Sequence, residues 1–525
     1  MSHINLKPGL SNLRYDLPAS LVVFLIALPL CLGVAVASGV PAFSGIIAGA
    51  VGGIVIGLFS GSQLSVSGPA AGLTVIVLNA VQSLPGFEAF LLAVFLSGII
   101  QLLLGVLKAG LIGDFIPSAV IRGMLAAIGL ILILKQIPHA VGYDKDYEGD
   151  FSFLQTDGKN TISELTGLFN EVLSVGAIVI FLLSMVLLNL WDSKRVKSNP
   201  YLQYVPGPLL VVILGILLNS FFTSFAPEMA IRSEHLVSIP VAASASSFFG
   251  QFSFPDFSHI GNPQIWVTAF TLAIVASVET LLNIEAVDKI DPFKRISPTN
   301  RELVAQGVGN MASGLIGGMP VTSVIVRSSA NVSSGGRTRV ATIIHGLLML
   351  LSVALIPAFL NMIPLSALAA VLIAVGYKLT KPEIFVRKWK KGHAHFYPFV
   401  ITVLAILLTD LLIGVLVGLV AGSVFIVISN FKSAIVYIAD GNNHLIRFQK
   451  NLSFIHKLEL KKVLMKIPDD ITLLMDISKI DFVDYDNAEI INDFIDNAAV
   501  RDIKVILKRN PSHSTDIIKE PIELV

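Results

Sequence analysis

The sequence carries little charge for its length. Only 14% of its 525 residues are Asp, Glu, Lys or Arg, whereas a soluble domain normally has about 25%. The shortage is greatest in residues 18–137, while residues 441–525 have an ordinary soluble composition. With 54% hydrophobic residues and a mean hydropathy of +0.78, the composition excludes a wholly soluble protein. It predicts an α-helical polytopic membrane protein with a soluble C-terminal part.

The sequence also lacks the residue sets that catalysis and metal binding require. Cys31 is the only cysteine, so no internal disulfide and no cysteine-based metal site can form. No cluster of His, Cys, Asp or Glu has metal-ligand spacing, and no nucleophile–base pair is visible. The net charge of +1, without a basic-aromatic stripe, argues against nucleic-acid binding. We therefore predict no enzymatic activity, no cofactor, no metal and no nucleic-acid partner.

Long apolar runs fill the region that lacks charge. A helix needs about 20 apolar residues to cross the hydrocarbon of a bilayer. Runs separated by Gly, Pro or charge predict fourteen transmembrane segments, of which 303–317, 322–334 and 363–376 are too short to cross alone. The fourteen segments lie near 19–37, 43–59, 68–84, 87–106, 115–137, 172–190, 206–224, 264–283, 303–317, 322–334, 338–361, 363–376, 396–409 and 411–430.

Basic residues follow the even-numbered segments. Lys and Arg cluster in the loops at 191–199, 288–301 and 378–393, whereas the loops at 142–160 and 226–238 are acidic or nearly neutral. Because positive loops stay in the cytoplasm, this alternation predicts an even number of segments with both termini cytoplasmic. We expect a cytoplasmic N-terminal segment (1–17), a membrane domain (18–432) and a cytoplasmic C-terminal domain (433–525).

Two apolar segments are interrupted at matching places. Pro69, in SVSGPAAGLTVIV (65–77), enters the third segment of the first half, and Pro320 enters the third segment of the second. Such paired breaks are the sequence sign of an inverted-repeat transporter with its substrate site between them. The first N–H groups of each broken helix would face a polar cavity, and small residues such as Ala70 and Ala71 would let an anion approach. The alternative is that each Pro only ends a loop before an ordinary helix.

One arginine lies inside the second interrupted segment. Arg327 follows the break by about one turn, and a cation at membrane depth costs about 2.5 to 3.5 kcal/mol on insertion scales. We predict that its positive charge lines an anion cavity. The alternative is an arginine near a helix end whose head group reaches the membrane surface.

One acid ends a long apolar stretch in the eighth segment. A buried, isolated carboxylate must be protonated or paired, so we predict that Glu279 binds a coupling Na⁺ or H⁺, or balances Arg327. The alternative is an acid at the cytoplasmic helix end, near Glu285 and Asp288. We expect structural or interfacial roles for Arg122, Lys135, Asp114 and Asp410, and simple packing for His345.

The charged C-terminal part has a different periodicity. Residues 443–450, 470–478 and 502–508 are predicted to form strands, and residues 454–467 and 487–500 amphipathic helices. Strands that alternate with helices predict a small α/β domain. Because no catalytic constellation is visible there, we interpret it as a regulatory or assembly module.

The chain resembles the SulP family of inorganic anion permeases, whose members end in a cytoplasmic STAS domain. The resemblance rests on ALPLCLGVAVASGVP (27–41), SVSGPAAGL (65–73), ETLLNIEAVDKI (279–290) and LLMDISKIDFVD (473–484). It is most specific in NRELVAQGVGNMASGLIGGMPVTSVIVRSSANVSSGGRT (300–338) and covers nearly the whole chain. It implies seven-plus-seven inverted repeats that form a core and a gate domain, with substrate between the broken third and tenth segments.

The resemblance also implies site residues and partners. Glu279 matches the acid that many bacterial members place on the eighth segment, where it is thought to support proton or sodium coupling. Many members have Gln at the position of Leu30, so binding here would depend more on backbone groups, with N–H donors at Val324 and Ile325. Dimers are usual in the family, and we expect a homodimer in a bacterial inner membrane. The substrate would be lined by Leu30, Val34, Ala70, Ala71, Val324, Ile325 and Arg327.

We predict a secondary active transporter of bicarbonate or sulfate. Its core domain would move against the gate domain like an elevator within the membrane lipid, coupled to Na⁺ or H⁺. One alternative is a nucleobase or dicarboxylate carrier of the same fold, which would use carboxylates such as Glu279. Another is a non-transporting membrane sensor or scaffold that acts through its STAS domain.

Overall fold

The protein folds as two compact units, residues 1–419 and 420–525. The structure, a computed structural model, describes residues 10–143, 160–168, 173–193, 205–239, 245–431 and 434–509, and a few single positions between and after them. The predictions for residues 1–9, for most of the acidic loop at 144–159, for parts of the basic loop after 193 and for residues 520–525 lie outside the described residues.

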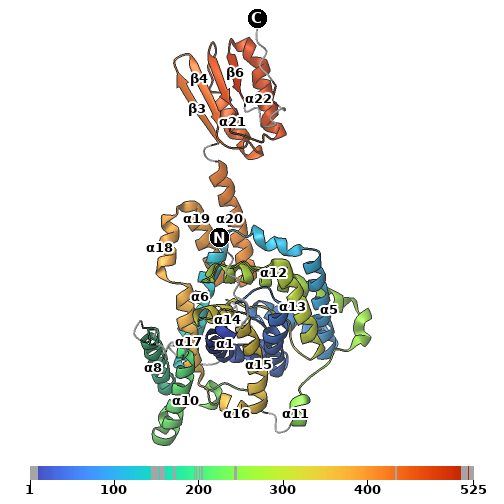
Figure 1. The fold of residues 1–525 in the computed structure, drawn as a ribbon, viewed down its shortest axis with the longest axis vertical. Coiled ribbons are helices and arrows are strands. Elements are labelled where there is room, and N and C mark those ends of the chain that lie inside the picture. The colour runs from blue at the N-terminus through green and yellow to red at the C-terminus, as the bar shows by residue number, and fades with distance from the viewer. Residues whose placement is uncertain are drawn as a thin grey trace. The chain divides into compact units, whose positions relative to one another are not determined.

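The first unit is helical (Figure 1). Its helices lie close to the fourteen predicted segments, with several short helices between them. They are α1 (Leu10–Ala37), α2 (Ala42–Val51), η1 (Gly52–Ile56), α3 (Gly57–Phe59), η2 (Ala71–Leu73), α4 (Thr74–Ser83), α5 (Phe87–Val106), η3 (Ala109–Phe115), α6 (Ser118–Val141), α7 (Thr161–Gly167), α8 (Val175–Trp191), α10 (Gly207–Phe225), η6 (Pro227–Met229), η7 (Ser233–His235), α11 (Ala245–Phe249), η8 (Phe257–Gly261), α12 (Pro263–Ile290), α13 (Thr299–Leu315), α14 (Ile325–Ser333), α15 (Val340–Leu355), α16 (Pro357–Leu360), α17 (Leu365–Leu379), α18 (Pro382–Lys390) and α19 (His393–Leu408). A last helix, α20 (Leu411–Phe431), begins in the first unit and ends in the second.

Seven stretches of helix among the described residues are long and apolar enough to cross a membrane. They contain α1, α2 with its continuation to Phe59, α5, α6, α10, α12, and α17 together with α18. Shorter apolar helices correspond to α4, α8, α15, α19 and α20, so several segments fall below the length of a full span. The helices confirm the prediction of a polytopic α-helical membrane protein.

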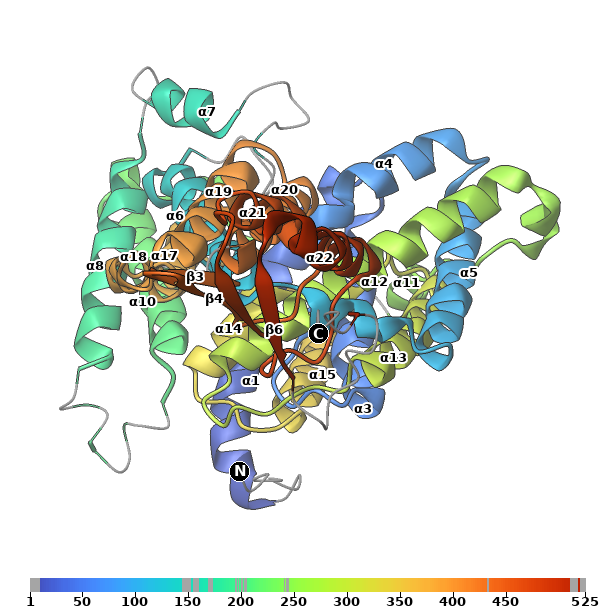
Figure 2. The same ribbon diagram turned by 90° about the horizontal axis from the view of Figure 1, so that it is seen from above.

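The helices of the first unit form two groups that differ in their neighbours. In the first helix group, α1, α2, α5, α12, α13, α14 and α15 contact one another. In the second helix group, α6, α8, α10, α17 and α19 contact one another, and α18 packs on α19. Figure 2 shows α8, α10 and α17 on one side and α4, α5 and α13 on the other. The two groups correspond to the expected core and gate.

A two-stranded sheet lies inside the first unit. Strand β1 (Ser67–Gly68) pairs antiparallel with β2 (Thr322–Ser323), and all four residues are buried. Strand β1 directly precedes the predicted break at Pro69, whereas β2 begins two residues after the predicted break at Pro320. Antiparallel pairing is what two halves of opposite orientation require, so the register agrees with an inverted repeat.

The second unit is a small α/β fold. Its sheet has the order β3 (Ile435–Asp440), β4 (Asn443–Phe448), β5 (Thr472–Asp476) and β6 (Lys504–Lys508), with β3 antiparallel to β4 and the other neighbours parallel. Helices α21 (Lys457–Leu464) and α22 (Tyr485–Ala498) connect the parallel strands, as βαβ units require. The three predicted strands and both predicted helices are present, while strand β3 was missed.

Candidate functional site

The two helix breaks meet at the β1–β2 pair. Ser67 lies opposite Ser323, and Gly68 lies opposite Thr322. The chain leaves β1 through Pro69 and Ala70 and enters η2 and α4, and it leaves β2 through Val324 and enters α14. The prediction that the two interrupted segments converge is therefore confirmed.

Side chains of α12 and α13 hold the strand pair in place. Asn283 Nδ2 donates to the Ser323 carbonyl at 2.5 Å, and the Ser323 N–H donates to Thr280 Oγ1 at 3.3 Å. Gln306 Nε2 donates to Ser67 Oγ at 2.7 Å. Because buried polar groups are costly without partners, these bonds fix both strands against the helices behind them.

At the tip of the first break, two backbone N–H groups donate to no acceptor among the described residues. The first helical bond runs from the Leu73 N–H to the Ala70 carbonyl at 3.2 Å, so the N–H groups of Ala71 and Gly72 precede it. These amides carry the positive end of the helix dipole. Gly72 is exposed and has no side chain to cover them. The small residues predicted at this tip are therefore present where an anion could reach the backbone.

The second break differs from the prediction at one residue. The first bond of α14 runs from the Ser328 N–H to the Val324 carbonyl at 3.1 Å, which leaves the N–H groups of Ile325, Val326 and Arg327 ahead of it. The Val324 N–H, however, donates to the Val66 carbonyl at 2.9 Å. The expectation that Val324 offers a free donor was wrong, because the strand ladder continues one residue beyond β2.

A cavity of about 70 Å³ lies between the tips of both breaks and α6. A cavity needs about 10–15 Å³ to hold one water, so this space accommodates a small hydrated or dehydrated anion. It lies between the two helix groups, because α12 and α14 line one side and α6 the other. Its lining residues are Ala70, Ala71, Gly72, Ile128, Ile131, Leu132, Glu279, Asn283, Val324, Ile325, Val326, Asp410 and Leu411.

Glu279 is the central acid of this cavity. Its side chain is 7% exposed, and Oε2 has no hydrogen-bond partner among the described residues. A Cβ atom on Gly72 would lie only 3.0 Å from Oε1, so the carboxyl group rests against the tip of the first break. Within the described part of the chain no cation pairs with Glu279, and the expected balance with Arg327 is not formed as an ion pair.

Arg327 is buried beside the strand pair instead of in the cavity wall. Its side chain is 1% exposed, and Nη2 donates to the Pro69 carbonyl at 3.3 Å. Gly68 makes room for it, since a Cβ there would lie 1.8 Å from Nη1. Nε and Nη1 have no hydrogen-bond partner in the described residues. The Cys31 thiol and the His345 ring are close enough to the guanidinium to interact with its positive charge. The guanidinium therefore lies behind the first break and does not line the cavity.

Two other predicted residues lie in the packing around the cavity. Leu30 is buried with Leu282 and Ile325 in one apolar cluster, and Val34 with Leu73 and Val77 in another. Neither lines the cavity. Their contact with a substrate stays a prediction.

Two polar lining residues were missed as site residues. Asn283 follows Glu279 by four positions, and that spacing on a helix places both on one face. Asp410 precedes α20, where its carboxylate accepts the Ile413 N–H at 2.8 Å as a helix cap. The helical spacing could have identified Asn283, but Asp410 reaches the cavity only through the packing of α20.

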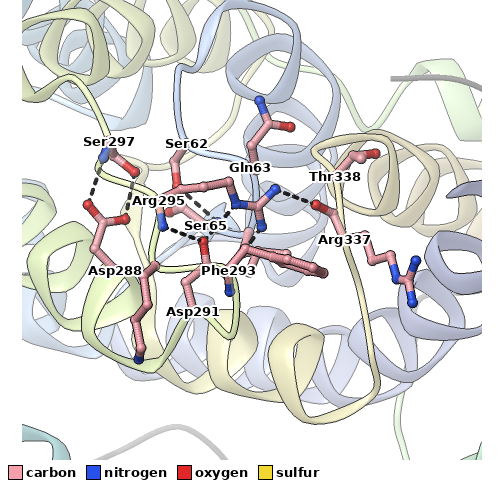
Figure 3. Close-up of polar contacts among 12 residues, drawn as sticks. Ser62, Gln63, Ser65, Asp288, Asp291, Phe293, Arg295, Ser297, Arg337 and Thr338 are labelled. Carbon is pink, nitrogen blue, oxygen red and sulfur yellow. Dashed lines mark hydrogen bonds and ion pairs between the residues drawn. The ribbon is translucent and has the colours of Figure 1, made fainter. Parts of the chain in front are cut away.

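A polar network joins the loops next to the site into one body (Figure 3). Arg295 donates from Nε to Asp291 at 2.7 Å and from Nη1 to the Arg337 carbonyl at 2.7 Å. Asp16 of α1 accepts the N–H groups of Arg337 and Thr338 at 2.7 and 3.0 Å. The N-terminal part of α1, the loop after α12 and the loop after α14 are therefore tied together.

The sequence matches known proteins over most of its length. The profile described as "Sulfate permease family" matches residues 13–403. The "Putative sulfate transporter YvdB" of Bacillus subtilis is 28% identical over 419 residues, which are 80% of this chain and 74% of the relative. The "Bicarbonate transporter BicA" of Picosynechococcus sp. is 26% identical over 455 residues, which are 84% of this chain and 75% of the relative.

Two solved structures share the fold. SLC26A9 aligns with a TM-score of 0.66 at 18% identity, covering 97% of this chain and 86% of that one. The transmembrane domain of a cyanobacterial bicarbonate transporter, BicA, aligns with a TM-score of 0.52 at 23% identity, covering 79% of this chain and 98% of that one. At these identities the two structures bear on the fold alone.

Proposed function

The chain belongs to the sulfate permease family, a family of membrane transporters, and we propose that it carries sulfate or bicarbonate by secondary active transport. It is a multi-pass integral membrane protein whose relatives include sulfate and bicarbonate transporters. One observation carries the proposal: the tips of two broken helices meet at β1–β2 and present free N–H groups to one cavity.

The anion binds mainly through the backbone. The N–H groups of Ala71 and Gly72 at one tip, and of Ile325 at the other, donate to it, and no basic side chain is among the lining residues. Ala70 and Val324 complete the two tips. Arg327 adds positive potential from behind Pro69, at a distance where a buried charge is little screened. Val34 belongs to the packing around the first break, and Leu30 to the packing around the second.

Glu279 couples the anion to Na⁺ or H⁺. Its unpartnered oxygen lies in the same cavity as the amides, with Asp410 nearby. A carboxylate and an anion in one small cavity repel each other unless a cation or a proton joins them. Co-binding of the two ions therefore lowers the cost of loading the site, and this linkage is the basis of symport.

Transport proceeds by movement of the first helix group against the second. The cavity lies between the groups, and the network around Arg295 and Asp16 makes the first group move as one body. Both termini are cytoplasmic in this proposal, because the basic loops lie on that side. The protein is a homodimer of a bacterial inner membrane, and its α/β unit is a STAS domain that regulates transport.

Uptake by purified protein in liposomes tests the proposal. Labelled sulfate and bicarbonate are supplied with and without Na⁺ and pH gradients, to wild type and to Arg327→Ala. We expect uptake of at least one anion, stimulated by one gradient and reduced by the substitution. Absence of uptake by protein that elutes as a single folded species would contradict transport, and anion binding without uptake would favour the sensor. Uracil or succinate uptake insensitive to Arg327→Ala would favour the other carriers.

A further inference from the structure

Helix α18 exposes apolar and basic side chains together between two apolar helices. Ile384 and Phe385 pack into the core of the second helix group, whereas Val386 and Trp389 are 54% and 56% exposed. α18 follows α17 directly and packs on α19, both of which are apolar membrane helices (Figure 1). A short helix with exposed Trp and Lys at the end of a membrane span lies in the bilayer interface.

Lys388 lies on the buried side of this helix, and two exposed cations, Arg122 and Lys391, lie near it. Lys388 is only 7% exposed, and its Nζ lies 5.9 Å from the centre of the Phe399 ring. Arg122 of α6 and Lys391 are close enough to repel it. Gly123, next to Arg122, touches the backbone of Phe399, since a Cβ there would lie 2.8 Å from its carbonyl oxygen. The contact between α6 and α19 therefore places Arg122 near Phe399, the residue that Lys388 also approaches.

These cations have no acidic partner in the part of the chain that the structure describes. Neither Lys388, Lys391 nor Arg122 forms an ion pair or a hydrogen bond with a carboxylate there. The N-terminus of α6 lies about one turn from Arg122 and adds a partial positive charge. A buried ammonium group beside like charges is stabilised by a compensating anion, a role that the C-terminal end of α18 fills only in part.

We propose that α18 and Arg122 bind the headgroup phosphate of an anionic phospholipid. Lys388, Lys391 and Arg122 contact the phosphate, while Val386 and Trp389 sit among the adjacent acyl chains and glycerol groups. A dissolved anion would contact only the cations and would leave the exposed apolar side of α18 in water. A lipid contacts the cations with its phosphate and the apolar side with its acyl chains. The leaflet is the one that faces the basic loops, which is the cytoplasmic leaflet if the orientation proposed above holds.

The bound lipid anchors the second helix group. α6, α17 and α19 surround the site and belong to that group, so the lipid fixes it to the membrane while the first group moves (Figure 2). This site shares no residue with the cavity at the helix breaks. Lipid binding can therefore fail or succeed independently of anion transport.

Native mass spectrometry of the purified full chain tests the site. The protein in detergent is incubated with phosphatidylglycerol or phosphatidylcholine, and retained lipid is counted for wild type, Lys388→Gln/Lys391→Gln and the control Arg387→Gln/Lys390→Gln. The control removes the same charge from the same helix but spares Lys388, Lys391 and Arg122. We expect wild type to prefer phosphatidylglycerol and the site variant to lose about fivefold in retention for each cation removed. The control should stay near wild type.

Three results would overturn the proposal. They are equal retention of the two lipids by wild type, equal loss in both variants, and displacement of phosphatidylglycerol by excess inorganic phosphate. The first would show no headgroup preference, the second only diffuse attraction, and the third a site for dissolved anions. If Lys388→Gln lowers the thermal midpoint in detergent, Arg122→Gln and the wild-type headgroup comparison decide the question.

Discussion

The two helix breaks occupy equivalent places in the two halves but differ in what they offer. The first ends in Ala71 and Gly72, whose amides are free and uncovered by side chains. The second ends in the half-buried Val324 and the buried Ile325, and the Val324 amide belongs to the strand ladder. The second also carries Arg327, whereas the first has no charged side chain at its tip.

This difference indicates that the first break is the more accessible to a ligand, whereas the second is the more firmly held by hydrogen bonds. The first break is the side that a ligand reaches most directly, because only small residues cover its amides. The second is fixed by Ser328, which accepts the Val66 N–H at 2.9 Å, and by Asn331, which donates to the Leu64 carbonyl at 3.0 Å. The two halves of the inverted repeat therefore differ in the hydrogen bonds at their helix breaks, because the residues around each break are different.

Filling the tip of the first break should have the largest effect. Gly72→Val places a branched side chain in the cavity and against the carboxyl group of Glu279, whose oxygen would lie 3.0 Å from the new Cβ. We expect anion uptake to fall by about 100-fold, since small displacements of a binding group have effects of that size. Val75→Leu, on the exposed face of α4, is the control and should stay within about twofold. Normal uptake by Gly72→Val would mean that the ligand does not approach this tip.

Neutralising the acid beside the first break should remove coupling. Glu279→Gln keeps the shape of the side chain but binds neither Na⁺ nor a transferable proton. In wild type, each pH unit of gradient, or each tenfold Na⁺ gradient, can raise the internal anion concentration about tenfold. We expect Glu279→Gln to lose this accumulation, while exchange of anion down its own concentration gradient persists. Liposome uptake with imposed gradients measures this, and Glu285→Gln on the same helix is the control. Unchanged accumulation by Glu279→Gln would assign coupling elsewhere.

Displacing the charge that the second break contributes should have a moderate effect. In Gly68→Ala the new Cβ would lie 1.8 Å from Nη1 of Arg327, so the guanidinium must move away from Pro69. We expect about fivefold weaker anion binding and a loss of about 1–3 kcal/mol in stability from overpacking. Isothermal titration and thermal unfolding separate the two effects. Gly113→Ala is the matched control, because the nearest atom to its new Cβ would lie 3.5 Å away, at an ordinary contact distance. Wild-type affinity in Gly68→Ala would exclude a role for the guanidinium.

Weakening the support of the second break should affect stability more than binding. Ser328→Ala leaves the buried Val66 N–H without its acceptor, which costs about 1–3 kcal/mol. Anion affinity should change by no more than about twofold, because the cavity lining stays intact. Thermal unfolding and binding are compared with Ser333→Ala, which lies at the exposed end of α14. A large loss of affinity without a loss of stability would contradict the supporting role.

The sequence predicted the architecture well and the contacts of the site only in part. Apolar runs indicated the membrane helices, and the paired prolines indicated the two breaks. Both signals are local, because the length of an apolar run and the missing N–H of a proline can be read from neighbouring residues alone. The predicted positions of Ala70, Ala71, Ile325 and Glu279 at the cavity agree with the structure. Arg327 was expected in the cavity wall, but the space left by Gly68 draws it behind the first break.

The C-terminal unit shows the same limit. Its alternating pattern predicted β4, β5, β6 and both helices. Strand β3 was missed because it follows the last membrane helix, where an apolar strand resembles a continuation of the apolar run. Its assignment depends on pairing with β4, from Ile435 opposite Phe448 to Asp440 opposite Asn443.

By itself, the sequence determined that this chain is an interrupted-helix membrane protein, since composition and the two Pro breaks need no long-range information, and its motifs were enough to match it to the sulfate permease family. Only the tertiary structure decided which amides stay free and which side chains reach the cavity. The physical reason is that a hydrogen-bond donor at a helix end is available only if nothing else accepts it. For Val324 that acceptor is Val66, which lies in the other half of the membrane unit.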